Sequence, residues 1–532
     1  MRTAAGAPAP EAPYPVSDTF RATPRLELAA VTLAVSAGAV LRFWSLGHGI
    51  PYAVGADEPE IVLRAVRMMK TGDFNPHFFD YPGLYIYMQL AVACARFLFG
   101  AMQGAWRSLD QVGPEQFYLW GRALTASLGT ATVALVYLIG RRWGRPQALA
   151  AASLMAVMPL HVRESHYVLT DVPMTFFVAS AFLLALRAAE RTTVAGFAWA
   201  GVAAGLAAAT KYYGGLIVSA PVVLALATDR RSARPAAAAA AAIAAAIAAF
   251  LLAAPYTVMD LPAFLNGFAS MSPALAGRDL SEDPGWLIYM KHLRLSLGWP
   301  ASAALIVGLA VAVRQAIRGP ERARWAVLAL FPSVYFWLLS SRTLIFGRYL
   351  MPIMPFVALI AGIAVVSVFQ LLRDLASRAK DGRLRRRPLR AALAAALVLP
   401  VLLPPTLTSC SFNRRLGLTS TYALAYEWIL ANVPRSAKVA IETAGLRLPT
   451  DRYDVEQMKT LILRDYEAFR AGGFDYFIAS SQSFGSALEA PHLRPKHYEA
   501  YRRLFETASL VQKIVPSTDH PGPELRIYRV EQ

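Results

Sequence analysis

Long runs of apolar residues recur along the first four hundred residues of the chain, separated by short polar segments. Runs of about 17–25 apolar residues have the length needed to cross the hydrocarbon core of a bilayer. The pattern therefore predicts an all-α polytopic membrane protein with about eleven transmembrane helices. The predicted spans are 26–46, 118–140, 147–162, 172–188, 193–209, 214–228, 236–258, 298–314, 325–340, 350–372 and 391–409.

One further apolar run, 83–100, is predicted to lie along the membrane interface rather than to cross the membrane. With this assignment, five arginine-rich connections all fall on one side. Loops on the cytoplasmic side carry an excess of Lys and Arg, so this side is predicted to be cytoplasmic, together with the N-terminus. The long segments 47–117 and 259–297 then lie outside. The five connections are 141–145, 187–191, 229–235, 314–324 and 373–390.

The pattern changes after residue 410, where charges become mixed and short alternations of apolar and polar residues begin. Alternation over 438–442 and 474–478, with a closing segment at 524–530, is typical of strands, while 422–431 and 453–471 are predicted as helices. The chain is therefore predicted to have three parts. They are a cytoplasmic tail (1–25), a transmembrane domain (26–410) and a small extracytoplasmic α/β domain (411–532).

Composition supports this interpretation: 56% of the residues are hydrophobic and 17% are charged. Soluble domains average about 45–50% apolar and about 25% charged residues, so a soluble enzyme is disfavoured. The net charge of +18 does not indicate a nucleic-acid partner, because the tail and the five connections alone hold 23 Lys and Arg against seven acids. The two cysteines are too few for a disulfide framework or a thiolate metal site.

Charged side chains beside the outer helix ends are the candidates for chemistry, because membrane proteins keep ionisable groups out of hydrocarbon unless function requires them. Asp57 and Glu58 precede Pro59 at a predicted helix start, where an acidic N-cap is the simpler interpretation. Asp80 and Tyr81 open an aromatic-rich stretch that also resembles an interfacial belt.

Three further places carry polar groups at outer ends. His161 and His166 are five residues apart, so they do not lie on one helix face as the histidine pair of a zinc protease does. Asp171 is equally well explained as a helix cap. Lys211 could simply extend to lipid headgroups. Arg348 lies against the charge rule and needs a partner, for which a phosphate is natural.

At these residues the sequence resembles the C-type glycosyltransferases, in the bacterial group that includes protein O-mannosyltransferases and lipid A aminoarabinose transferases. The resemblance covers most of 26–372. It is carried by Asp57-Glu58, the Asp80-Tyr-Pro-Gly-Leu-Tyr85 start, Ser165-His166 with Thr170-Asp171-Val-Pro173, Gly205 to Lys211-Tyr212, and Gly347-Arg348-Tyr349-Leu-Met-Pro352.

The resemblance implies a sugar donor carried on a polyprenyl phosphate, reached from the membrane lipid, and transfer to an acceptor hydroxyl on the outer side of the cytoplasmic membrane. It implies Asp57 as general base, and with that role we expect Glu58 to position the loop or acceptor and Asp171 to orient the neighbours of Asp57 or the sugar. Lys211 and Arg348 would hold the leaving phosphate. The remaining expected substrate contacts are Asp80, Tyr81, His166 and Tyr349.

The aminoarabinose enzymes have Glu-Lys-Pro where this chain has Asp80-Tyr81-Pro82, so their specificity is not implied. The sugar and the acceptor (lipid, glycan or protein) stay open. No cofactor is required, although a metal-dependent transferase like the oligosaccharyltransferases, with Asp57 and Asp171 as ligands, is an alternative. Two further alternatives are a transporter or flippase of lipid-linked sugars and an assembly subunit with a degenerate site. A transporter would be expected to place its charges nearer the middle of the membrane.

Overall fold

The computed structural model describes residues 24–55, 57–227, 234–276, 283–342, 344–378, 387–442 and 446–531. Most of the predicted tail 1–25 and the centres of the connections 229–235 and 373–390 lie outside these residues. Each of the eleven predicted spans coincides with helical structure. The corresponding elements are α1 (Pro24–Phe43), α4 (Tyr118–Gly140), α5 (Arg145–Val157), α7 (Asp171–Arg191), α8 (Val194–Thr210), η4 (Tyr212–Val218) with α9 (Ser219–Leu226), α10 (Pro235–Ala253), α13 (Gly285–Arg318), α14 (Arg322–Ser340), α15 (Met354–Arg378) and α16 (Arg387–Leu416).

The protein is a multi-pass membrane protein. Within the described ranges, nine helices are long and apolar enough to cross a bilayer, and eight of them match predicted spans. Helices α5, α8 and α9 are shorter, with 13, 17 and 8 residues. The predicted span at 298–314 is only part of α13, which begins at Gly285 and is interrupted at Gly298, where the backbone is left-handed (φ 72°).

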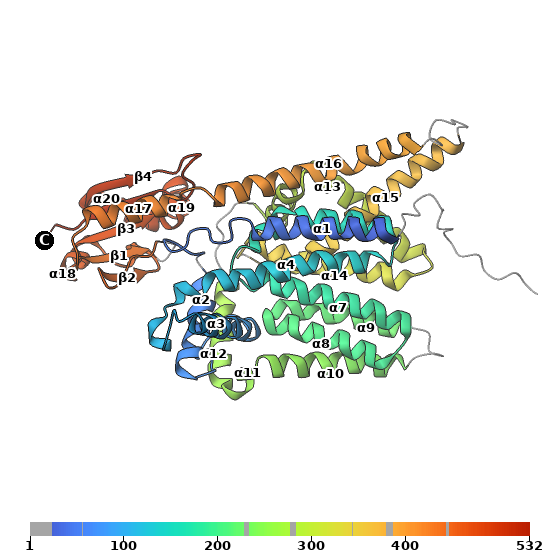
Figure 1. Cartoon of the computed structure of the whole chain (residues 1–532), viewed down its shortest axis with the longest axis horizontal. Coiled ribbons are helices and arrows are strands. Elements are labelled where there is room, and N and C mark those ends of the chain that lie inside the picture. Colours follow the sequence, from blue (N-terminus) through green and yellow to red (C-terminus); the bar gives the residue numbers. More distant parts are fainter. Residues whose placement is uncertain are drawn as a thin grey trace, which may run out of the picture.

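The ninth long helix is α3 (Leu84–Met102), which contains the run predicted to lie at the interface. Figure 1 shows α3 nearly end-on, across the direction of the bundle helices, at the same end of the bundle as α2 (Glu58–Thr71), α11 (Tyr256–Met259) and α12 (Leu261–Ala276). The helix is therefore oriented as the interfacial assignment requires. Of the arginine-rich connections, those that the structure describes throughout (141–145, 187–191 and 314–324) lie at the opposite end of the bundle.

The alanine-rich helix α10 packs against α8 at unusually short range. A Cβ atom at Gly201 of α8 would lie 2.1 Å from the carbonyl oxygen of Ala242, and one at Gly205 would lie 2.2 Å from that of Ala246. Small residues let helix backbones approach closely in membranes, where van der Waals contact replaces the hydrophobic effect as the driving force. The low-complexity tract is therefore a packing surface of the bundle.

The C-terminal part forms a mixed five-stranded sheet beyond α16, at the α3 end of the bundle (Figure 1). Its strand order is β2-β1-β3-β5-β4, with β1 (Lys438–Glu442) parallel to β2 (Asp454–Met458) and β3 (Tyr476–Ser480), and with β5 (Leu525–Arg529) antiparallel to β3 and β4 (Ser509–Ile514). The helices of this part are α17 (Thr421–Asn432), η7 (Leu461–Leu463), α18 (Tyr466–Ala471), α19 (Ser481–Glu489) and α20 (Pro495–Thr507).

One element of this domain was predicted wrongly from the sequence. The segment 453–471, expected to be a helix, contains strand β2, the short η7 and then α18. Asp454–Met458 pairs along its whole length with β1, in a register that sets Val455 against Val439. Ladder hydrogen bonds to a neighbouring strand outweighed the helix-like spacing of a short segment.

Candidate active site

Four charged side chains from distant parts of the sequence meet at the α3 end of the bundle, and we call them the charged cluster: Asp57, Asp171, Lys211 and Arg348. Each lies where a helix begins or ends. Asp57 precedes α2, Asp171 is the first residue of α7, Lys211 separates α8 from η4, and Arg348 lies in η5 (Gly347–Ile353). Helix ends place side chains at the rim of a bundle without interrupting the helices.

Ion pairs connect the cluster in a chain of alternating charge. The Lys211 ammonium donates a hydrogen bond to Asp171 Oδ1 at 2.7 Å, and both side chains are buried. Arg348 Nε lies 3.9 Å from Asp171 Oδ2, and the Nη2 atom of Arg348 donates to Asp57 Oδ2 at 2.7 Å. The two cations that the sequence left without partners are therefore each matched by a carboxylate.

Arg348 has a buried donor that makes no hydrogen bond to the described residues. Its Nε atom is buried and has no hydrogen-bond acceptor among the described residues, while its Nη2 is engaged by Asp57. A guanidinium presents its N–H groups in a fixed fork that matches phosphate geometry. Arg348 can therefore accept an anion beside Asp171 without first losing its contact to the protein.

Two aromatic rings cover the cluster. The Lys211 ammonium lies 4.7 Å from the centre of the Tyr349 ring and 5.8 Å from that of Tyr81. A cation near an aromatic face is attracted by the ring quadrupole, and more strongly where water is excluded. Burial raises the pKa of Tyr81 well above its usual value, and the nearby Asp57 carboxylate adds to the effect, so Tyr81 is a neutral hydrogen-bonding group at neutral pH.

Glu58 does not join the cluster but fixes the residues around it. Its carboxylate accepts two hydrogen bonds from Arg122 of α4, at 2.8 and 2.7 Å, and one each from the backbone N–H groups of Gly55 and Val168. Neither the Glu58 nor the Arg122 side chain is exposed. The pair connects the loop before Asp57 to the turn before Asp171, as expected for a positioning group.

The simpler interpretations of Asp57 and Asp171 as helix caps are not supported. Asp57 occupies the N-cap position of α2 but makes no side-chain cap bond, and Thr170 rather than Asp171 is the N-cap of α7. Both carboxylates point instead to cations that come from segments far away in sequence. The two carboxylates form tertiary ion pairs, and the residues next to them in the sequence do not indicate such partners.

Two expected substrate contacts lie apart from the charged cluster. Asp80 is exposed on the loop that precedes α3. The His166 ring is buried and lies between the carbonyl oxygens of Val162 and Trp44, at 2.8 and 2.9 Å. This position ties the turn before α7 to the end of α1. Contact of either residue with substrate stays a prediction.

Sequence reasoning missed two buried ionisable side chains near the cluster, Arg122 and Glu164. Arg122 lies inside a predicted span, and an ionisable residue in such a place is itself a signal of function. Glu164 ends α6 (Pro159–Glu164) and pairs with Arg163 at 2.6 Å. Burial raises the pKa of Glu164, Arg163 opposes this effect, and the charge of Asp171 reinforces it.

Among the described residues, no group of three or more His, Cys, Asp or Glu side chains is arranged to hold a metal ion. The carboxylates of Asp57 and Asp171 are each engaged by a cation. This donor set does not fit a divalent cation, so we assign no step to a metal.

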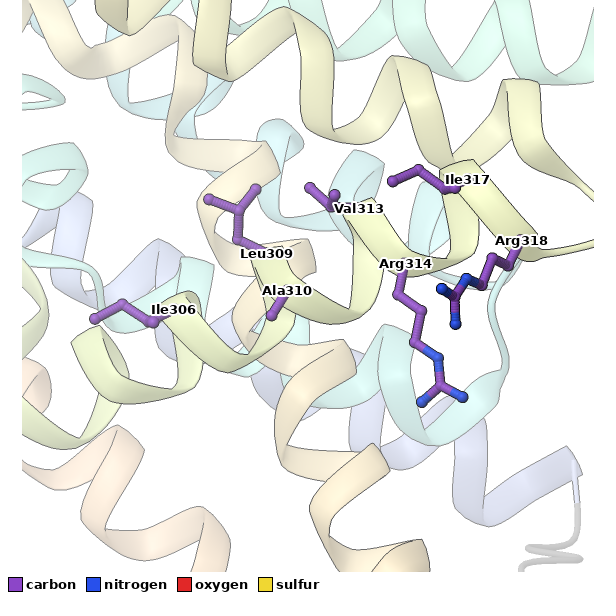
Figure 2. A pocket seen from close by; sticks show the side chains of 7 residues that line it. All are labelled: Ile306, Leu309, Ala310, Val313, Arg314, Ile317 and Arg318. Carbon is purple, nitrogen blue, oxygen red and sulfur yellow. The ribbon is translucent and has the colours of Figure 1, made fainter.

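A groove of about 590 Å³ lies elsewhere, along one face of α13. Figure 2 shows its apolar side chains on successive turns, followed by Arg314 and Arg318 near the helix end. A face of this kind is what a lipid-exposed helix with basic residues at the interface presents. None of the predicted site residues lines this groove.

Known proteins resemble this chain in part of its sequence and in its fold. Residues 75–258 match the family described as dolichyl-phosphate-mannose-protein mannosyltransferase. The structure resembles the apo form of the Archaeoglobus fulgidus oligosaccharyltransferase (TM-score 0.58, 13% identity, 88% of this chain and 71% of that chain). It also resembles ArnT from Cupriavidus metallidurans bound to undecaprenyl phosphate (TM-score 0.56, 14% identity, 94% of this chain and 98% of that chain). No curated protein matches the chain by sequence.

Proposed function

We propose that this chain, which carries a domain of the dolichyl-phosphate-mannose-protein mannosyltransferase family within the C-type glycosyltransferase fold, transfers a sugar from a polyprenyl-phosphate-linked donor to an acceptor hydroxyl. Transfer takes place on the extracytoplasmic face of the cytoplasmic membrane, the side assigned by the distribution of arginines. The observation that carries the proposal is the charged cluster, in which two cations and two carboxylates meet at one end of the bundle.

The solved relatives support the class of donor. One structure of the Archaeoglobus fulgidus oligosaccharyltransferase AglB contains a dolichol-phosphate with an inhibitory peptide, and the ArnT structure contains undecaprenyl phosphate. Both ligands are long isoprenoids that end in a phosphate. Lys211 and Arg348 provide cations for such a phosphate, and Arg348 Nε is a buried donor with no hydrogen-bond acceptor among the described residues.

Stabilisation of the leaving phosphate is the first chemical task. As the bond from the anomeric carbon to the phosphate oxygen breaks, negative charge grows on the phosphate and positive charge grows on the sugar. Charge-assisted hydrogen bonds from Lys211 and Arg348 would stabilise the phosphate, and more strongly in a partly dehydrated cleft than in water. Asp171, which holds both cations, would keep them in place.

Activation of the acceptor is the second task, which we assign to Asp57. Its carboxylate is about one-third exposed, so an acceptor hydroxyl can approach it. A phosphate bound at Arg348 Nε would share the positive charge of the guanidinium with Asp57 and so weaken its hold on that carboxylate, which would then accept the hydroxyl proton. A single displacement with one base predicts inversion at the anomeric carbon.

The test uses the full-length protein in nanodiscs with a synthetic polyprenyl phosphosugar. Asp57→Asn is expected to lower turnover by about 10²-fold or more, the usual contribution of a general base, with donor binding retained. Glu60→Gln is the matched control, because Glu60 is exposed in the first turn of α2 and its ion pair among the described residues is with Arg64. Turnover by Asp57→Asn close to that of the control would exclude Asp57 as the base.

The phosphate assignment has its own test. Arg348→Ala is expected to weaken binding of the bare polyprenyl phosphate, whereas Arg342→Ala, an exposed arginine nearby, is not. Equal affinities in the two variants would exclude Arg348 as a phosphate ligand. Retained activity in EDTA is expected, and activity lost in EDTA and restored by a divalent cation would favour the metal-dependent alternative.

The acceptor is best identified in the cell. A strain that lacks this chain is expected to lose one sugar from a glycan, lipid or protein of the envelope, and the Asp57→Asn variant is expected not to restore it. Restoration by that variant would contradict the proposed role of Asp57.

A further inference from the structure

The C-terminal domain touches the loop that carries Asp57. Ala53 and Leu446 form an isolated antiparallel bridge, and the backbone N–H of Arg447 donates to the carbonyl oxygen of Tyr52 at 2.8 Å. Ala53 and Leu446 are both buried. A segment of the C-terminal domain therefore pairs through its backbone with a loop near the N-terminus. The pairing lies only four residues before Asp57.

The Arg447 side chain strengthens this contact. Its Nη2 atom donates to the Tyr118 hydroxyl at 2.9 Å, and its guanidinium lies 5.1 Å from the centre of the Tyr118 ring. Tyr118 is buried in the first turn of α4, the helix that also provides Arg122. Arg447 thus joins the C-terminal domain, the Asp57 loop and the transmembrane bundle at one point.

The Asp57 loop is held at both ends by these contacts. On one side, Glu58 is fixed by Arg122 and by the backbone of Gly55 and Val168. On the other side, Tyr52 and Ala53 pair with the C-terminal domain, and the N–H of Ala53 also closes a turn onto Gly49 at 2.7 Å. Gly49 has a φ of 74°, in the left-handed region, which residues with a side chain rarely adopt.

The strand that leads to Arg447 is itself anchored. Glu442, the last residue of β1, is buried and accepts hydrogen bonds from the backbone N–H groups of Ser480 and Leu461 and from the Tyr501 hydroxyl. These donors are all neutral, so the carboxylate is held by dipoles. The end of β1 is therefore fixed within the domain, four residues before Leu446 in the sequence.

We propose that Arg447 is a positioning residue for Asp57, and that the C-terminal domain is in this way part of the catalytic machinery. Arg447 acts without touching Asp57 or the phosphate-binding cations; it sets the path of the loop on which Asp57 lies. This inference rests on the proposed role of Asp57 as base. Misplacement of a base by about 1 Å lowers the rate strongly, whereas donor binding depends on Lys211 and Arg348 from other segments.

Full-length Arg447→Ala in nanodiscs is expected to lower kcat by about tenfold or more, with the donor KM and the affinity for bare polyprenyl phosphate unchanged within about twofold. Arg470→Ala is the matched control, since Arg470 is exposed on the same domain. Tyr118→Phe, which removes only the hydroxyl, is expected to lower kcat in the same direction. The double variant should be no worse than the more damaging single variant, because the two changes remove one interaction.

Amide hydrogen exchange adds a measurement that is independent of activity. Arg447→Ala is expected to speed exchange over residues 49–58 while β1 and β3 stay protected, which also shows that the domain remains folded. Unchanged kcat in Arg447→Ala, with Asp57→Asn inactive, would overturn the positioning role alone. Full activity in Asp57→Asn would overturn the proposed function instead, whatever Arg447→Ala does. A fall in donor affinity equal to the fall in kcat would also contradict the inference.

Discussion

Arg122 and Glu58 form a doubly hydrogen-bonded ion pair whose side chains are completely buried, although 64 residues separate them in sequence. The same carboxylate accepts from the backbone on either side of the cluster, at Gly55 and Val168. The pair therefore decides where Asp57 and the turn before Asp171 lie relative to α4. The pair would affect the reaction by positioning Asp57 and Asp171, without contact to the reacting groups.

Glu58→Ala is expected to destabilise the protein by about 3–5 kcal/mol, because it leaves the Arg122 guanidinium buried without a counter-charge. Thermal unfolding in detergent measures the loss. Glu60→Ala provides the comparison, since its exposed pair with Arg64 should contribute less than about 1 kcal/mol. Similar unfolding temperatures for the two variants would show that the buried pair does not hold the loop.

The Lys211–Asp171 pair predicts an asymmetry between single and double variants. Asp171→Asn is expected to lower stability by about 3–5 kcal/mol, because it leaves a buried ammonium without its carboxylate. Adding Lys211→Met removes that charge and should recover most of the stability, whereas donor binding stays weak. If the double variant is less stable than Asp171→Asn, the two residues do not compensate each other.

The close approach of α8 and α10 predicts that Gly201 tolerates no larger side chain. Gly201→Val places its Cβ against the Ala242 carbonyl oxygen and should cost about 1–3 kcal/mol or more through overpacking. The yield of monodisperse protein and its unfolding temperature measure the effect. Ala195→Val, on the exposed side of the same helix, should behave like the parent.

Glu442 predicts a pH dependence of stability in the C-terminal domain. Burial raises its pKa above the ordinary value of 4.5, against the lowering effect of its hydrogen bonds. The folded state therefore binds more protons than the unfolded state between the ordinary and the raised pKa, so this group makes stability fall as pH rises through that window. Unfolding temperatures measured from pH 4.5 upward should show a steeper fall for the parent than for Glu442→Gln, and equal slopes would contradict the assignment.

The sequence predicted much of the fold because membrane spans follow from length and hydropathy, which are local properties. The interfacial placement of 83–100 followed from the arginine distribution, a property of the chain as a whole. The helix predicted at 453–471 was wrong because its first residues, Asp454–Met458, pair with β1, and the sequence of one segment does not show which strand lies beside it.

The candidate site was only partly predictable for the same reason. Composition and position singled out Asp57, Asp171, Lys211 and Arg348 one by one. Their pairing depends on tertiary packing: 291 residues separate Arg348 from Asp57, and 40 separate Lys211 from Asp171. Arg447 gave no local signal at all, because an arginine after a strand in a mixed-charge domain is ordinary on its own.

The bridge between Ala53 and Leu446 has a consequence for biogenesis. All four residues of the charged cluster precede residue 350, so a nascent chain that has reached α16 already contains every charge of the site. The backbone contact that closes the Asp57 loop is added only when residues 446–447 leave the ribosome and the C-terminal sheet folds. The charged groups are therefore synthesised before the site can assemble, and at least 98 residues of translation, from Arg348 to Leu446, separate the two events.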